Sequence, residues 1–134
     1  SIAAAQAVLK YIKDENLQEH CKKAGAALLK ALKEVQERHP ESVGDVRGAG
    51  LFLGFEFVKN DGNKTPDKDM ALNVIEMLRD EHILTSVIGH YGNILKLRPP
   101  MVFSENDIDW FATSLDKCTL NICVLFFAYN KNFT

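Results

Sequence analysis

The fold is decided by the stretch Asp45-Val46-Arg47-Gly48-Ala49-Gly50-Leu51-Phe52-Leu53-Gly54-Phe55-Glu56-Phe57. Two glycines precede its apolar run, and glycine lets a chain turn sharply because it tolerates positive φ and close backbone approach. Every second residue from Leu51 to Phe57 is apolar, which is the period of a β-strand. Phe52 and Val58 keep the opposite face largely apolar, so we predict a central strand that is covered on both faces.

Two helices are predicted before this strand. Residues 1–13 carry an apolar stripe at steps of three and four, which is typical of a helix with one buried face. A second helix is expected to begin after Asn16, which has Glu19 at the spacing of a capping box. It should end at His39-Pro40, because the residue before proline avoids the helical region.

Two helices and two short strands are predicted after it. Thr65 is the expected N-cap of the third helix, with Pro66 at its first position. Ser104 with Asp107 should cap the last helix. Residues 83–87 and 93–98 read as strands, separated by a loop with two glycines. The predicted fold class is therefore α/β, or an α+β layer, in which helices pack against a small sheet.

Composition and charge limit the possible functions. The chain has 134 residues, which suits one domain, and 46% of them are hydrophobic, which is enough for a core. A formal net charge of -2 provides no field that would attract nucleic acid or a membrane surface. The three cysteines have no metal-binding or disulfide spacing, and no signal peptide is recognised. We expect an intracellular protein, although a transit peptide could have been lost because the chain does not begin with Met.

No complete catalytic centre is recognisable in the sequence. Gly48-Ala49-Gly50 precedes a strand rather than opening a helix, which disfavours a dinucleotide-binding loop. The four histidines are scattered, so we expect no metal site. No Ser, Cys or Lys lies in the sequence setting of an activated nucleophile.

Lys96 and Arg98 form the most informative charged pair. Strand alternation places both on one face, about 7 Å apart, and Pro99-Pro100 makes the exit of the strand rigid. Two such cations could hold a carboxylate or a phosphate. The alternative is a pair of solvated charges that protect an edge strand, and the spacing alone favours this alternative.

Several segments together resemble one known family. Asp45 to Gly54, followed by Asn93-Ile94-Leu95-Lys96-Leu97-Arg98-Pro99-Pro100-Met101, is similar to the C-terminal small domain of class III pyridoxal-phosphate aminotransferases. Ser1 to Ala7 resembles the helix by which that family's chain leaves the cofactor domain. Within the class, the sequence most resembles the alanine–glyoxylate aminotransferase 2-like branch, which includes the ethanolamine-phosphate and phosphohydroxylysine phospho-lyases. The resemblance implies a small domain over residues 1–118 and an atypical apolar tail over residues 119–134.

The resemblance also implies what this chain lacks. The family's enzymes are homodimers of fold type I, and a lysine of the large domain holds pyridoxal 5′-phosphate as a Schiff base. That domain would precede Ser1, so we expect no catalytic residue and no cofactor-binding residue here. The chain alone should bind no cofactor and be inactive. Membership would place the whole enzyme in mitochondria or cytoplasm.

The same resemblance assigns a role to the charged pair. Several relatives have, at the position of Lys96, an arginine that grips the substrate carboxylate, and the lyase-like branch has lysine there. Lys96 and Arg98 are then the expected substrate-binding residues, and the expected partner is an amine or amino acid with an anionic group. Neither nucleic acid nor a membrane is expected as a partner. A non-catalytic α/β interaction module is the alternative function, because the catalytic set is missing.

The end of the chain departs most from the family. Residues 120–127 form a nearly unbroken apolar run where relatives continue a charged, amphipathic helix. The run is shorter than the roughly 20 residues that a membrane span requires. We interpret it as an alternative or truncated terminus; a tail that packs on the missing domain or on a partner subunit is the other interpretation.

Overall fold

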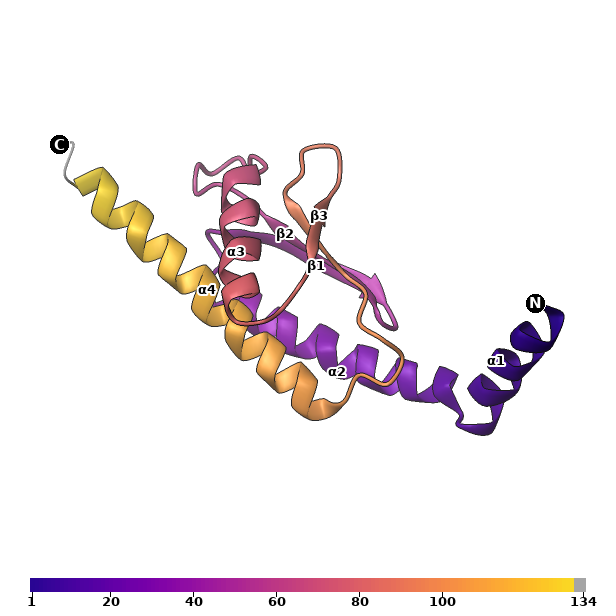
Figure 1. The fold of residues 1–134 in the computed structure, drawn as a ribbon. Coiled ribbons are helices and arrows are strands. Elements are labelled where there is room, and N and C mark those ends of the chain that lie inside the picture. Colours follow the sequence, from indigo (N-terminus) through magenta and orange to yellow (C-terminus); the bar gives the residue numbers. More distant parts are fainter. Residues whose placement is uncertain (132–134) are drawn as a thin grey trace.

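The computed structural model describes the backbone of residues 1–131 and the side chains as far as residue 125. Helices pack against a four-stranded sheet, which confirms the predicted fold class (Figure 1). The elements in chain order are α1 (Ile2–Asp14), α2 (Leu17–Arg38), β1 (Val43–Ala49), β2 (Phe52–Phe57), α3 (Lys68–Asp80), β3 (Ser86–Ile88), β4 (Ile94–Leu97) and α4 (Glu105–Lys131).

The sheet is antiparallel throughout, with the strand order β1-β2-β4-β3. The sequence analysis missed β1, because it interpreted the residues before the glycines as a corner. They are instead the first arm of a hairpin in which Arg47 pairs with Gly54 and Ala49 with Phe52. Strand β1 has only two buried valines, Val43 and Val46, and a register shift lies between Val43 and Asp45. Its sequence therefore lacks the clean alternation that identifies a strand.

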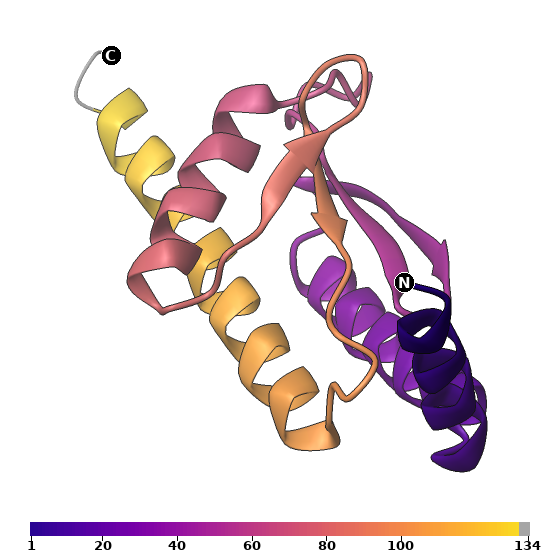
Figure 2. The same cartoon turned by 45° about the vertical axis from the view of Figure 1, so that its right-hand side comes forward.

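Helices cover only one face of this sheet. Helices α2 and α3 pack against the strands, and α4 runs across both helices, as Figure 2 shows. Leu53, Phe55 and Phe57 of β2 are buried on that side, as the alternation predicted. The other face is not covered by the described residues, and Phe52 on it is 56% exposed. The predicted covering of both faces is therefore wrong for this part of the chain.

The β1–β2 turn rests directly on helix α2. A Cβ atom built on Gly25 of α2 would lie 2.2 Å from the carbonyl oxygen of Gly50 and 2.6 Å from its Cα atom. Gly50 has φ 54° and Gly48 has φ 147°, backbone conformations that residues other than glycine rarely adopt. Gly25 therefore allows the hairpin to approach the helix at backbone distance, and Gly48 and Gly50 allow the backbone conformation of the turn.

Of the three predicted helix N-caps, the structure confirms only the one at Ser104 and Asp107. Ser104 and Asp107 cap α4 reciprocally, since the Asp107 carboxylate accepts hydrogen bonds from both the backbone N–H and the hydroxyl of Ser104. Helix α3 is capped by Asp67 and not by Thr65, because the Asp67 side chain accepts from the N–H of Met70. Asn16 precedes α2 with φ 50° and makes no side-chain cap bond, so the predicted capping box is wrong.

Helix α4 continues through the apolar tail. Its C-terminal half packs near the end of α2, where Ile122 is buried and the sulfur of Cys123 lies 3.2 Å from the hydroxyl oxygen of Ser42. His39 fixes the same junction, because its Nε2 atom lies 2.7 Å from Oδ1 of Asp116. Leu120, Val124 and Leu125 stay exposed. The predicted tail runs to residue 134, and its last three residues lie outside the described part.

Helix α1 lies apart from the sheet and contacts α2 alone among the elements of the chain (Figure 1). The predicted helix is present, but none of its residues is buried. Its apolar stripe is exposed instead, with Leu9 at 67% and Ile2 at 76%. The amphipathic pattern therefore indicates a surface that the described residues do not cover.

Candidate functional site

Strand β4 carries the predicted charged pair. Lys96 is half-buried and lies between Gly54 of β2 and Ser86 of β3 in the register of the sheet. Its neighbours Leu95 and Leu97 are buried against the helices, so alternation places Lys96 on the uncovered face. Arg98 follows the end of β4 and is exposed. The residues are thus brought to one face, as the strand period predicted.

Phe52 lies beside Arg98. The Cζ atom of Arg98 is 5.9 Å from the centroid of the Phe52 ring, a distance at which a guanidinium is attracted to an aromatic face. Leu53 pairs with Leu97, so the antiparallel register places Phe52 across from Arg98. The ring and the cation therefore come from neighbouring strand ends.

A cavity of about 620 Å³ opens next to this pair. Lys96 and Arg98 contribute to its wall, together with residues 82–86 before and at the start of β3. The hydroxyl of Thr85 donates a hydrogen bond of 3.1 Å to the carbonyl oxygen of Lys96, which fixes that wall to β4. Most of the remaining wall is apolar and comes from Leu28, Pro99, Pro100, Phe103, Trp110 and Phe111.

Neither cation has an acidic partner among the described residues. None of the ion pairs that these residues form includes Lys96 or Arg98. The cavity wall contains no Asp or Glu. An unpaired Lys and Arg on the wall of a largely apolar cavity can bind an anion through charge-assisted hydrogen bonds. This arrangement gives the predicted clamp a physical basis, and its role in binding is still a prediction.

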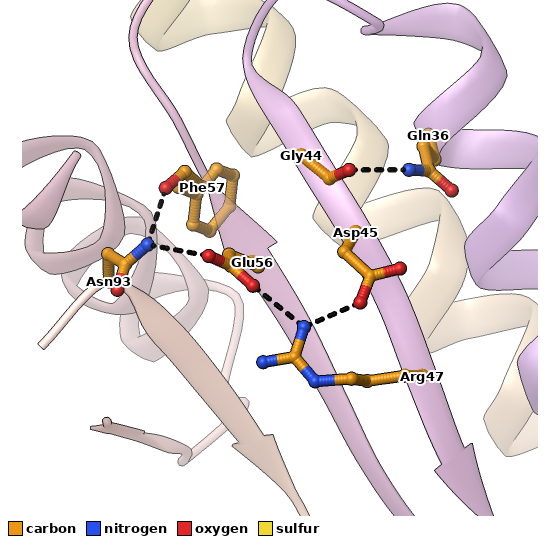
Figure 3. Close-up of polar contacts among 7 residues, drawn as sticks. All are labelled: Gln36, Gly44, Asp45, Arg47, Glu56, Phe57 and Asn93. Carbon is orange, nitrogen blue, oxygen red and sulfur yellow. Dashed lines mark hydrogen bonds and ion pairs between the residues drawn. The ribbon is translucent and has the colours of Figure 1, made fainter. Parts of the chain in front are cut away.

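A second arginine on the same face is already paired. Arg47 of β1 donates to Asp45 at 2.6 Å and to Glu56 at 2.7 Å (Figure 3). The hydrogen bond to Glu56, followed by the bond to Asp45, raises the pKa of Arg47 above its usual value. Because two carboxylates neutralise it, Arg47 is less suited than Lys96 or Arg98 to binding an external anion.

Asn93 anchors this network from the start of β4. Its side chain is buried, and its Nδ2 atom donates to the carbonyl oxygen of Phe57 at 2.8 Å and to Glu56 at 3.4 Å (Figure 3). The network therefore joins β1 and β2 to the residue that precedes β4. Its effect is to fix the positions of the strands that carry Gly54 and Lys96.

Metal-ligating side chains are not clustered in the described residues. These residues contain no group of three or more His, Cys, Asp or Glu side chains that could hold a metal ion. His90, the histidine in the glycine-flanked loop, packs against Tyr91 with ring centroids 4.8 Å apart. No helix within residues 1–131 is both long enough and apolar enough to cross a membrane.

The sequence analysis missed several residues of this site. Phe52 was predicted to lie on a covered face, His82 was one of the four scattered histidines, and Trp110 had no predicted role. Their proximity to Arg98 depends on the register of β2 against β4 and on the path of α4 past the strand ends. Sequence periodicity carries neither kind of information; the exposed position of Trp110 in a predicted helix was the only available signal.

Comparisons with known proteins show the family to which the chain is similar. The family described as class-III aminotransferases matches residues 1–119. The chain is 43% identical over 116 residues to the ethanolamine-phosphate phospho-lyase homolog 1 of Caenorhabditis elegans. The matched region covers 86% of this chain and 25% of that protein. It is 35% identical to the mitochondrial alanine–glyoxylate aminotransferase 2 homolog 2 of Arabidopsis thaliana, over 87% of this chain and 24% of that protein.

Solved structures show the same fold. A phospholyase from Arthrobacter in complex with phosphoethanolamine matches with a TM-score of 0.83 and 34% identity, over 88% of this chain and 28% of that one. The chain therefore spans about a quarter of the length of the relatives that it matches.

Proposed function

The chain belongs to the class-III aminotransferase family, and from that premise we propose that it is the small domain that closes the substrate site of a pyridoxal-phosphate-dependent transaminase or phospho-lyase. The substrate class is an amine or amino acid with an anionic group. Two relatives support it by their names: one is a phospho-lyase homolog for ethanolamine phosphate, and one structure holds phosphoethanolamine.

One observation carries this proposal. Lys96 and Arg98 line the same cavity, and no carboxylate of the described residues pairs with either of them. Arg47 on the same face differs, because two carboxylates already pair with it. We assign to the pair the binding of the phosphate or carboxylate of the substrate. Lys96 provides a compact charge, and Arg98 provides a planar fork that fits two oxygens.

The residues of this chain do not fit the cofactor itself. Pyridoxal phosphate acts as an electron sink when it is bound; it takes a lysine as its Schiff-base partner, and an aspartate or arginine faces its ring nitrogen. The cavity wall holds no acidic residue, and Lys96 is its only lysine. We therefore assign cofactor binding and the chemical step to parts of the enzyme outside this chain. The contribution of this chain is to bind and orient the anionic end of the substrate.

Substitution in the parent enzyme tests the clamp. We expect Lys96→Ala and Arg98→Ala each to raise the KM for the anionic substrate about ten- to hundred-fold, because a hydrogen bond to a charged group is lost. The value of kcat should change little if the contact is equally strong in the ground and transition states. Lys59→Ala, at an exposed lysine just after β2, is the matched control and should leave KM unchanged.

Two results would contradict these assignments. An unchanged KM in both clamp variants would show that the pair does not bind substrate. Borohydride treatment of this chain with pyridoxal phosphate should fix no cofactor site-specifically on a lysine. A single modified lysine, found by mass spectrometry, would show that the chain holds the cofactor after all.

The assembly and location of the whole enzyme are also proposals. We propose a homodimer, as the family resemblance implies, in mitochondria or cytoplasm. The mitochondrial relative from Arabidopsis supports the first of these locations. The alternative function is a non-catalytic interaction module, which the missing catalytic residues would favour. A stable, well-folded monomer of this chain would be the observation in its support.

A further inference from the structure

Lys96 and Arg98 face different residues on the neighbouring strand β2. Lys96 pairs with Gly54, which has no side chain, whereas the position across from Arg98 is occupied by the ring of Phe52. Phe52 is more than half exposed and makes no contribution to the buried core. An exposed aromatic ring at a hairpin end therefore lies where it contacts one of the two cations.

We propose that Phe52 is a positioning residue for Arg98, so that the β1–β2 hairpin fixes one arm of the anion clamp and leaves the other arm, Lys96, free to adjust. This inference rests on the proposed function of the clamp. Its physical basis is the contact between the guanidinium and the ring face, together with the like charge of Lys96 on the same face.

The contact has a consequence for binding. Two unpaired cations about 7 Å apart on one face repel each other, and an arginine at a strand end has many rotamers. A ring across the sheet favours the rotamers in which the guanidinium stays beside β2. An anion then orders one flexible side chain instead of two, and such pre-organisation improves affinity.

The β1–β2 hairpin is itself held rigidly, which makes it a suitable support. Its turn packs on Gly25 of helix α2 at backbone distance. Arg47 joins its two strands through Asp45 and Glu56, and Asn93 connects Glu56 to the start of β4. The position of Phe52 therefore follows from contacts on both sides of the hairpin.

The test measures the reaction of Arg98 with phenylglyoxal in the chain of 134 residues, by peptide mapping with mass spectrometry, with inorganic phosphate as the anion. We expect Phe52→Leu to raise the modification rate of Arg98 about two- to five-fold, the range of an exposed cation–π contact, and to weaken protection by phosphate by a similar factor. Phe52→Tyr keeps a ring face and should restore both values.

Two controls separate positioning from a general loss of structure. Arg79 on α3, which pairs with Glu76, serves as an internal reference. Tyr91→Leu makes the same aromatic-to-aliphatic change in the β3–β4 loop and should leave Arg98 unaffected. A parallel rise at Arg79 in the Phe52→Leu variant would mean that the change loosens the whole fold, and it would overturn the proposal.

The outcomes distinguish this inference from the proposed function. Equal rates at Arg98 in the wild type and in Phe52→Leu would overturn the positioning role. A rate that rises in Phe52→Leu and recovers in Phe52→Tyr supports it. If phosphate fails to protect Arg98 in the wild-type chain while Phe52 still controls its rate, the positioning role holds and the anion clamp is refuted.

Discussion

Gly25 and Gly50 meet where helix α2 passes beneath the β1–β2 turn. In the solvent-exposed interior of a helix, glycine is less favourable than alanine by about 1 kcal/mol, because glycine loses more backbone freedom on folding. Gly25 is nevertheless required, since a Cβ atom there would overlap the backbone of Gly50. Backbone atoms cannot rotate away as a side chain can, so the clash would have to move either the helix or the hairpin.

Replacement of Gly25 should therefore reverse the usual effect of a glycine-to-alanine change. We expect Gly25→Ala to lower the free energy of unfolding by about 3 kcal/mol, at the upper end of the cost of overpacking a core. Gly54→Ala is the control, because its Cβ would lie 3.3 Å from the Cγ2 atom of the Ile94 side chain and would reach backbone only at 3.9 Å, at the carbonyl oxygen of Arg47. Urea unfolding followed by circular dichroism measures both. Equal stability of the two variants would show that the turn does not rest on α2.

The elements of this fold differ in how far local sequence determines them. Helix α4 begins where Ser104 and Asp107 form reciprocal hydrogen bonds. Both residues of this capping motif lie within four positions of each other, so the motif can be recognised in the sequence alone. The hydrogen bonds from the Ser104 hydroxyl and then from its backbone N–H lower the pKa of Asp107. A depressed carboxylate pKa stabilises the folded state above the pKa of the unfolded chain, about 3.9, and this contribution is lost as pH falls through the folded value.

The lowered pKa of Asp107 predicts how the effect of Asp107→Asn depends on pH. The wild type should have a higher Tm than Asp107→Asn at pH 7. The difference in Tm should shrink below about pH 3.9 and vanish below the pKa that Asp107 has in the folded protein. Thermal unfolding by circular dichroism across this pH range measures it. Asp109→Asn, two residues further along α4, should show a smaller difference at pH 7. A difference for Asp107→Asn that persists at pH 2 would exclude the carboxylate charge as its cause.

The same distinction explains which elements could be predicted. Amphipathic stripes predicted the four helices, and the alternation of apolar residues predicted β2 and β4. Both patterns depend only on residues that are close together in the sequence. Strand β1 was missed because two valines among glycines and charges have no clear period. Lys96 and Arg98 were placed on one face by alternation alone. Phe52 was not connected with them, since the register of β2 against β4 depends on packing between distant segments.

At the scale of the whole molecule, the uncovered surfaces follow a pattern. The described residues form one core between the sheet and helices α2, α3 and α4, and they leave uncovered the apolar stripe of α1, the second face of the sheet and the side of α4 that carries Leu120, Val124 and Leu125. A chain that spans about a quarter of its relatives' length would be expected to have such surfaces. Exposed apolar patches of this kind mark contacts with other polypeptide.

Helix α1 should dominate the association of the isolated chain, because none of its residues is buried, while Ile122 and Cys123 of α4 already pack on the domain. We expect the wild-type chain to form dimers or larger species by size-exclusion chromatography with light scattering. Val8→Lys together with Leu9→Lys should shift it to the monomer mass, with unchanged circular dichroism, since these side chains support no core. Leu120→Lys with Val124→Lys, on the exposed side of α4, should have the smaller effect. A wild-type chain that is monomeric at high concentration would mean that the stripe of α1 needs no covering, and it would favour the self-sufficient interaction module over the small domain of a larger enzyme.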